Sequence, residues 1–259
     1  MDDLLIAGRG AVTTLLFNRP AKRNAITFEM WRSLPAVLRD LEADPHVRVL
    51  VVRGAGEEAF ASGADISEFE RVRGDGAAAR KYGQAVEAAE RALAEFPRPT
   101  IAMIHGFCVG GGLEVALACD LRFASHAARF GITAARLSIV YGLTSTRRLA
   151  GVVGPSHARD ILFSARLFGT AEARAMGLVN AAYEPDALER ETFAYARLLT
   201  EQAPLSQRGA KLMLQYLAGE GGIADTDLAA FVDRAYESAD YREGVRAFLE
   251  KRPPRFSGR

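Results

Sequence analysis

The chain has few of the residues that bind metals or form disulfides. It contains two cysteines and four histidines in 259 residues. Cys108 and Cys119 lie in the same apolar region, which is typical of small buried side chains in a reduced compartment. The histidines are scattered without the spacing of metal ligands. We therefore expect neither a disulfide framework nor a metal site.

Signals for a membrane or nucleic-acid partner are also lacking. The formal net charge is only +1, so there is no basic excess of the kind that binds anionic polymers or lipid surfaces. The N-terminal residues Met1 to Asp3 are acidic and do not resemble a signal peptide. The most apolar stretch, residues 101–119, is interrupted by His105 and Glu114 and cannot be a membrane span. We expect a cytoplasmic protein.

Several catalytic motifs are absent as well. The sequence has no G-x-S-x-G, no H-E-x-x-H and no C-x-x-C, which argues against hydrolase, zinc-protease and thiol-redox chemistry. Its glycine cluster, Gly110 to Gly112, does not complete G-x-G-x-x-G, and no Gly-Lys-Ser/Thr follows it. A dinucleotide site and a phosphate loop are therefore not expected.

What is present is typical of a globular α/β protein with a large core. The chain is 49% hydrophobic and 25% charged. The pattern predicts a hairpin over residues 4–17, a helix after Thr27 with a kink or break at Pro35, and a buried strand over residues 47–52. Strands alternate with helices up to a short strand at 178–181, and the chain is helical from residue 186. We predict an α/β core over residues 1–195 and a C-terminal helical region over 196–259.

The most informative stretch runs from Pro99 to Asp120. An apolar strand, residues 100–104, is followed by three glycines and then by a helix-forming segment, residues 113–119. Glycines between a strand and a helix let free backbone N–H groups approach an anion at the positive end of the helix dipole. Glu114 is the first carboxylate beside them. Taken alone, the glycines could form an ordinary turn and Glu114 could be a solvated helix residue.

A second small-residue turn strengthens the catalytic interpretation. It lies in the segment A-F-A-S-G-A-D-I-S-E, residues 59–68, directly after the strand predicted at 47–52. Two separate turns of this kind can each donate one N–H to the same oxygen. Such a pair of donors forms an oxyanion hole.

These two motifs together resemble the enoyl-CoA hydratase/isomerase (crotonase) superfamily. The resemblance continues in N-R-P-A-K-R-N-A-I, residues 18–26, and in Y-R-E-G-V-R-A-F-L-E-K-R, residues 241–252, and covers nearly the whole chain. It implies the crotonase (ClpP-like) fold, a spiral of ββα turns followed by a C-terminal helical trimerisation region. It also implies an acyl-CoA substrate and a homotrimer or a dimer of trimers.

The resemblance also assigns the site. The backbone N–H groups of Ala64 and Gly111 would hold the thioester carbonyl and stabilise an enolate, with Glu114 as the acid/base. The residues that would bind coenzyme A are Lys22, Arg23, Ala25, Asp65, Ile66 and, toward a neighbouring subunit, Lys251. No separate cofactor is expected, because coenzyme A is part of the substrate.

One family residue is missing. Hydratases place a second glutamate in the loop after F-G-x-P, where it shares a water molecule with the first. Aligned without a gap from Phe130-Gly131 to Gly142, this chain has Ala134 at that position, and no acidic residue lies between Asp120 and Asp160. The two-glutamate mechanism is therefore not available as such, and the family's isomerases generally rely on the same position.

Tyr141 is a possible substitute. Its segment L-S-I-V-Y-G-L resembles that of methylmalonyl-CoA decarboxylase-like members, although those carry histidine where this chain has Ala64. Decarboxylation needs no base, because loss of CO2 generates the enolate directly. Hydration of a 2-enoyl-CoA through Glu114 is the main hypothesis. The alternatives are decarboxylation or isomerisation assisted by Tyr141, and a non-catalytic acyl-CoA-binding protein in which Tyr141 is only a packed aromatic residue.

Overall fold

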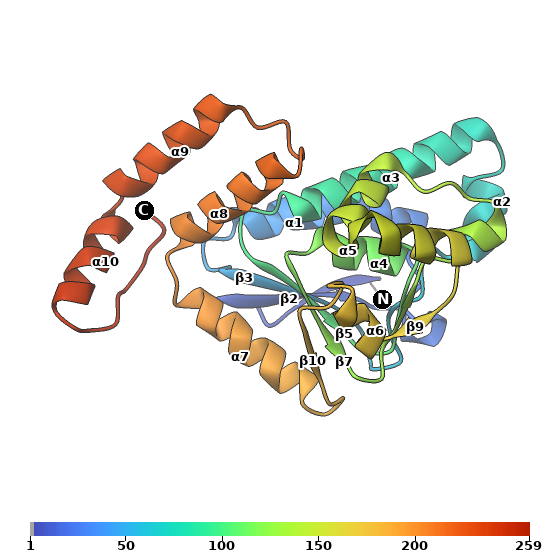
Figure 1. Ribbon diagram of the computed structural model, residues 1–259, viewed down its shortest axis with the longest axis horizontal. Helices are drawn as coiled ribbons and strands as arrows, with labels where there is room; N and C mark the ends of the chain where they lie inside the picture. The colour runs from blue at the N-terminus through green and yellow to red at the C-terminus, as the bar shows by residue number, and fades with distance from the viewer. Residues whose placement is uncertain (1–2) are drawn as a thin grey trace.

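Two β-sheets form the centre of the computed structural model, which describes residues 3–259 (Figure 1). The six-stranded sheet has the order β1 (Leu4–Ala7), β2 (Val12–Phe17), β3 (Val49–Gly54), β5 (Thr100–Ile104), β7 (Leu121–Ser125) and β10 (Ala181–Tyr183). Only the β1–β2 hairpin is antiparallel in it. The four-stranded sheet has the order β4 (Ala59–Ala61), β6 (Phe107–Val109), β8 (Arg129–Gly131) and β9 (Phe168–Gly169).

Helices pack on both faces of the six-stranded sheet, as the predicted α/β class requires. They are α1 (Phe28–Ala43), α2 (Phe69–Val72), α3 (Gly76–Ala94), α4 (Gly111–Ala118), α5 (Leu143–Ser164), α6 (Thr170–Ala175), α7 (Leu188–Thr200), α8 (Pro204–Leu217), α9 (Asp225–Glu237) and α10 (Ala239–Leu249). Three 3-10 turns cover Pro20–Lys22, Ile66–Glu68 and Ala134–Leu137. None of these helices, over the range 3–259, is long and apolar enough to span a bilayer.

The parallel strands are buried on both faces. In β3, Leu50 and Val52 pack into the large core beneath α1, α3 and α4, while Val49 and Val51 pack into a smaller core that α7 covers. Figure 1 shows α7 on the opposite side of the sheet from α1, α3 and α4. Burial on both faces explains why residues 49–52 of this strand are all apolar and do not alternate with polar ones.

Helix α1 begins as predicted but does not break at Pro35. The Thr27 hydroxyl accepts a hydrogen bond from the Met30 amide at 3.2 Å and caps the helix. The helix then runs through Pro35 to Ala43, so the predicted early break is wrong. A proline inside a helix removes one backbone hydrogen bond. A fully buried apolar stripe offsets that loss: Met30, Trp31, Leu34, Leu38 and Leu41.

The segment labelled α5 consists of two helices that meet at a kink at Gly154, where φ is 77°. Two elements differ from the sequence-based expectations. The last strand lies at Ala181–Tyr183 and not at 178–181, because the amides of Leu178 and Val179 donate to the Ala173 carbonyl at the end of α6 and not to a strand. The four-stranded sheet was not predicted, since its strands have only two or three residues each.

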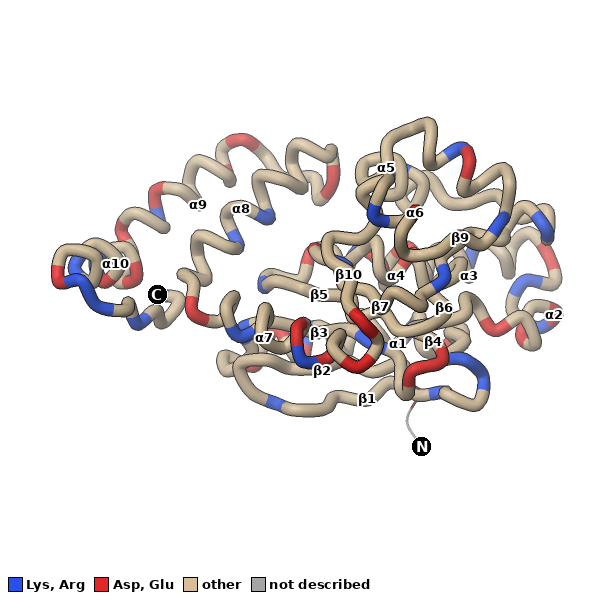
Figure 2. The backbone as a smooth tube through the Cα atoms, turned by 60° about the horizontal axis from the view of Figure 1, so that its bottom comes forward, with Lys and Arg blue, Asp and Glu red and all other residues tan. Residues whose placement is uncertain are grey.

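The C-terminal helices lie to one side of the sheets. Figure 1 shows α9 and α10 extending away from the body, and Figure 2 shows the same separation, with acidic and basic residues interspersed over both parts. Lys211 of α8 ties this region to the core through an ion pair with Asp120 at 3.0 Å. The expected boundary between residues 1–195 and 196–259 falls inside α7, and the division remains a prediction.

Helix α4 lies against β4 at a distance that only glycine permits. Gly110, with φ of 53°, turns the chain from β6 into the helix. A Cβ atom placed on Gly112 would lie 2.3 Å from the carbonyl oxygen of Ala61 in β4. Backbone atoms of a packed strand cannot move away as a flexible side chain would. The glycine is therefore required by packing.

We predict that Gly112→Ala lowers the free energy of unfolding by about 2–3 kcal/mol, because it overpacks the α4–β4 contact. Gly83→Ala is the matched control: Gly83 lies inside α3, and a Cβ there meets no atom within 4 Å. That control should raise stability by about 0.5–1 kcal/mol through helix propensity. Urea denaturation of both variants measures the difference. Equal effects of the two substitutions would contradict the packing argument.

Candidate active site

The two turns expected to form the oxyanion hole lie side by side. A Cβ atom placed on Gly110 would lie 3.6 Å from the Cα of Gly63, and one placed on Gly111 would lie 3.6 Å from the backbone nitrogen of Ala64. The residues come from the end of β4 and the start of α4, 47 positions apart in sequence (111 − 64). The fold therefore places the amides of Ala64 and Gly111 next to one another.

Both amides lack a hydrogen-bond acceptor within the described part of the chain. Across residues 3–259, neither the Ala64 nor the Gly111 N–H donates a hydrogen bond to another group of the protein. The neighbouring amide of Asp65 is used, donating to the Ile26 carbonyl at 2.9 Å. Gly111 is the first residue of α4, where N–H groups have no acceptor within the helix. Two adjacent, unpaired N–H groups are what an oxyanion needs.

The loop before α1 is fastened to the Ala64 turn. The Ile26 amide donates to the Gly63 carbonyl at 2.8 Å. Asn24, buried and with φ of 54°, donates from its side-chain amide to the carbonyls of Ala59 at 2.7 Å and Ala55 at 3.0 Å. These bonds fix the loop that carries the expected coenzyme A residues beside the oxyanion turn. The sequence indicated the loop but not the role of Asn24.

A wall of aromatic residues backs the Gly111 turn. A Cβ atom on Gly111 would lie 3.0 Å from the Trp31 ring, so a larger residue would clash there. The Trp31 indole N–H donates to the Tyr82 hydroxyl at 3.0 Å, and the Arg73 guanidinium lies 3.8 Å from the centroid of the Tyr82 ring. The sequence analysis did not predict any of these three side chains as part of the site. They join α1 and α3 to the segment between α2 and α3.

Glu114 lies beside the two amides. Its Oε2 atom is 3.6 Å from the position that a Cβ on Gly111 would occupy. The residue is half-buried, and protein atoms enclose its carboxyl end. Burial, and then the negative charge of nearby Glu90, raise the pKa of Glu114 to about 8. Three groups lower the pKa of Glu114 and so oppose this effect: Ser145, Arg73 and Tyr141.

Tyr141 also lies at this carboxyl group. Its hydroxyl is buried and has no hydrogen-bond partner in the described part of the chain. Burial, followed by the proximity of Glu114, raises the pKa of Tyr141 well above its ordinary value. Ala134 begins the 3-10 turn at 134–137 and packs against the apolar core, so it supplies no carboxylate. The structure thus brings Tyr141, and not residue 134, to Glu114 as a polar neighbour.

The residues expected to bind coenzyme A lie mostly around the same turn. Lys22 is exposed, and Ala25 is buried beside Ile26. The Arg23 guanidinium pairs with Glu58 at 2.6 Å and lies over the Phe107 ring. The basic side chains before Ala64 are therefore accessible to the phosphates of a ligand.

The other three residues expected to bind coenzyme A are Asp65, Ile66 and Lys251, and their surroundings differ. Asp65 pairs with Arg19 at 2.9 Å, and a hydrogen bond from Ser67 is the main cause that lowers the pKa of Asp65. Its carboxylate is thus engaged within the protein. Ile66 is 60% exposed next to it. Lys251 follows α10, which lies far from α4 in Figure 1, so the structure does not bring it to this site within one chain.

A buried carboxylate that sequence analysis missed lies next to Glu114. Glu90 of α3 is 2% exposed. It accepts hydrogen bonds from the Ser145 hydroxyl at 2.9 Å and from the Arg148 guanidinium at 3.2 Å. Burial raises the pKa of Glu90 to about 7 against the opposing effect of Arg148. A glutamate within the apolar stripe of α3, between Ala89 and Leu93, was the available signal.

Comparison with known proteins identifies the family of this chain. The sequence profile of the family described as Enoyl-CoA hydratase/isomerase matches residues 8–259. The chain belongs to this family.

Individual family members are similar over most of their length. The short-chain-enoyl-CoA hydratase of Clostridium acetobutylicum is 32% identical, with 97% of this chain and 96% of that protein covered. The mitochondrial methylglutaconyl-CoA hydratase of Mus musculus is 33% identical, with 95% and 80% covered. A crystal structure of an enoyl-CoA hydratase/carnithine racemase from Magnetospirillum magneticum superposes with a TM-score of 0.94 at 36% identity, covering 100% and 97% of the two chains. The expected crotonase fold is therefore confirmed.

The raised pKa of Glu114 predicts a pH-dependent cost to stability. The unfolded carboxyl ionises above its ordinary pKa of 4.5, whereas the folded one keeps its proton up to about pH 8. Stability is therefore lost as pH rises through this window. Glu114→Gln cannot ionise at this position, so it does not carry this cost. The difference in free energy of unfolding between Glu114→Gln and wild type should therefore be larger at about pH 8.5 than at about pH 5, by on the order of 2 kcal/mol in favour of the variant.

Urea denaturation at the two pH values and at one protein concentration measures this difference. Glu95→Gln, which removes an exposed carboxylate at the end of α3, serves as the control and should show no such change. A stability difference between Glu114→Gln and wild type that is the same at both pH values would show that Glu114 ionises normally in the folded protein.

Proposed function

We propose that the protein hydrates the double bond of a 2-enoyl-CoA thioester. The observation that carries this proposal is the pair of adjacent, unpaired amides of Ala64 and Gly111 with the Glu114 carboxyl beside them. Addition of water to the β-carbon of an enoyl thioester moves charge onto the thioester oxygen, and two fixed donors stabilise that charge. The similarity to proteins named short-chain-enoyl-CoA hydratase and methylglutaconyl-CoA hydratase, over most of their length, supports the same reaction.

In the proposed mechanism Glu114 handles both protons. Its carboxylate removes a proton from water while the water oxygen bonds to the β-carbon, and the electron pair of the double bond moves through the α-carbon to the thioester oxygen. The amides of Ala64 and Gly111 hold the resulting enolate, and each is worth about 2.7–4 kcal/mol of barrier. The carbonyl then re-forms as protonated Glu114 gives its proton to the α-carbon. Water is added without a second carboxylate.

A second reaction is favoured by one specific observation. The buried Tyr141 hydroxyl has no partner among residues 3–259, and such a group is costly unless a ligand or water satisfies it. A tyrosine hydroxyl at this place could donate to a carboxylate on the substrate, as decarboxylation would require. The negative charge of ionised Glu114 would oppose such a substrate. Hydration therefore remains the main proposal, and a non-catalytic acyl-CoA-binding role is the third candidate.

We predict that Glu114→Gln lowers kcat for crotonyl-CoA hydration by about 10²–10⁴-fold, because it removes the proton acceptor and leaves the oxyanion hole intact. For the wild type, kcat/KM should rise with pH and level off above the Glu114 pKa of about 8, since only the carboxylate accepts a proton from water. Steady-state kinetics across this range measure both effects.

Three outcomes distinguish the three candidate functions. Tyr141→Phe should keep most of the hydratase activity if Glu114 carries the reaction. Preferred turnover of methylmalonyl-CoA, lost in Tyr141→Phe, would instead establish the decarboxylase. Tight binding of acyl-CoA with no turnover of a broad acyl-CoA panel would establish the non-catalytic role.

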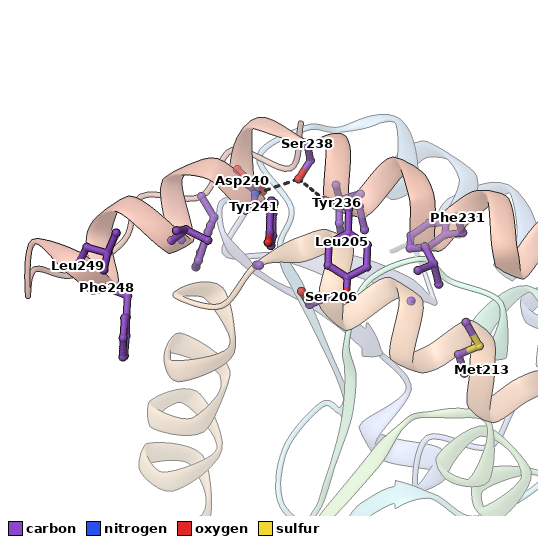
Figure 3. A pocket seen from close by; sticks show the side chains of 17 residues that line it. Leu205, Ser206, Met213, Phe231, Tyr236, Ser238, Asp240, Tyr241, Phe248 and Leu249 are labelled. Atoms are coloured by element: carbon purple, nitrogen blue, oxygen red, sulfur yellow. Dashed lines mark hydrogen bonds between the residues drawn. The ribbon is translucent and has the colours of Figure 1, made fainter.

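The proposal includes assembly through residues 196–259. A cavity of about 620 Å³ lies between α8, α9 and α10, and Figure 3 shows Leu205 and Met213 of α8 facing Phe231 and Tyr241 across it. Nearby apolar side chains are unusually exposed for a single chain, which is typical of a subunit interface. They include Leu214, Leu217, Phe248 and Leu249, exposed by 66%, 78%, 83% and 74%. A homotrimer or a dimer of trimers would cover them, and would bring Lys251 toward a neighbouring site.

We predict that Phe248→Asp lowers the molar mass in solution, measured by light scattering after size-exclusion chromatography, because it places a charge in this surface. Phe163→Asp is the control, since Phe163 is 77% exposed on α5, outside the C-terminal region. An unchanged oligomer for Phe248→Asp would show that this surface is not the interface.

A further inference from the structure

Two carboxyl groups, and not one, lie close together inside the proposed site. Glu90 comes from α3 and Glu114 from α4, two helices that pack against each other, and the negative charge of Glu90 raises the pKa of Glu114. Glu90 itself is only 2% exposed. A carboxylate buried this deeply is costly and is rarely kept without a partner or a role.

The Ser145 hydroxyl of α5 lies at Glu90. It donates to Glu90, with distances of 2.9 and 3.1 Å to the two carboxyl oxygens. Helix α5, like α3, packs against α4, and Ser145 is one of the groups that lower the pKa of Glu114. Ser145 therefore lies near both carboxyls.

Positive charge near Glu90 is shared and does not cancel the negative charge. Arg148 contacts Glu90 at 3.2 Å and Glu220 at 3.1 Å, so one guanidinium serves two carboxylates. Glu87, on the same helix, also acts on Glu90. The groups that face Glu114 are Glu90 and Tyr82 from α3, Arg73 from the segment after α2, Tyr141 from the loop before α5, and Ser145 from α5. Glu90 is the only carboxylate in that set.

We propose that Glu90 is a positioning residue of this site: the negative charge that it holds on the far side of the Ser145 hydroxyl makes Glu114 a stronger base toward water. The inference rests on the proposed hydration and extends it. A hydratase with two glutamates activates one water with two carboxylates, whereas Glu114 must do so alone. A neighbouring buried charge increases the affinity of Glu114 for the proton of water without touching the substrate.

The test is the pH profile of Glu90→Gln. Glutamine keeps an oxygen that can accept from Ser145 and Arg148 but removes the charge. We expect the acidic limb of kcat/KM to move to lower pH by about one unit, and the plateau rate to fall about three- to tenfold, because Glu114 becomes a weaker base. A residue that only supports the fold would lower the plateau without moving the limb.

Glu95→Gln is the matched control, since it removes an exposed carboxylate at the C-cap of the same helix and should leave the limb in place. Glu90→Asp is a second variant, which keeps the charge and should leave the limb close to that of the wild type. A limb of Glu90→Gln that coincides with that of the wild type, or a limb of Glu90→Asp displaced by about a full unit, would overturn the proposal.

A measurement without turnover separates this inference from the proposed reaction. The infrared carbonyl stretch of protonated Glu114, assigned by its loss in Glu114→Gln, can be titrated in the ligand-free protein. A midpoint about one pH unit lower in Glu90→Gln supports the coupling even if no enoyl-CoA is hydrated, in which case only the reaction is wrong. An unchanged midpoint in an active hydratase refutes the role of Glu90 and leaves the reaction intact.

Discussion

The contact between the turns Gly63–Ala64 and Gly110–Gly111 is the constraint on which the rest of the structure depends. It requires α4 to start within van der Waals distance of the chain that leaves β4, and Gly112 makes that approach possible. It also requires the loop before α1 to be fixed, which Asn24 achieves through the carbonyls at the end of β3 and in β4. The two sheets and the helices packed on them hold the two turns and this loop in fixed positions.

Surrounding side chains turn that contact into a site with an unusual charge balance. Trp31, Tyr82 and Arg73 close one side, while Glu90, hydrogen-bonded to Ser145, lies within the protein near Glu114. Burial makes both carboxyls hold their protons more firmly than in water. The stability cost of a carboxylate in this place is therefore linked to its value as a proton acceptor.

The sequence predicted the α/β class, the oxyanion turns and Glu114, because these depend on local motifs of glycine and small residues next to strands and helices. It did not predict Glu90, Trp31 or Arg73 as parts of the site. Their contacts join residues far apart in the chain, 51 positions for Trp31 and Tyr82 and 58 for Glu90 and Arg148. No local pattern records such pairs. Of the kink or break expected at Pro35, the break is wrong, since the continuation of α1 depends on how the whole helix packs.

The proposed oxyanion donors are main-chain groups, and this has a consequence for how such a protein could diverge. If they hold the thioester oxygen, substitution of side chains around them, as at Ala134 or Tyr141, would change which bond of a thioester is made or broken while the enolate would still be stabilised. Amino-acid replacement would then leave one chemical competence in place, because the backbone supplies it.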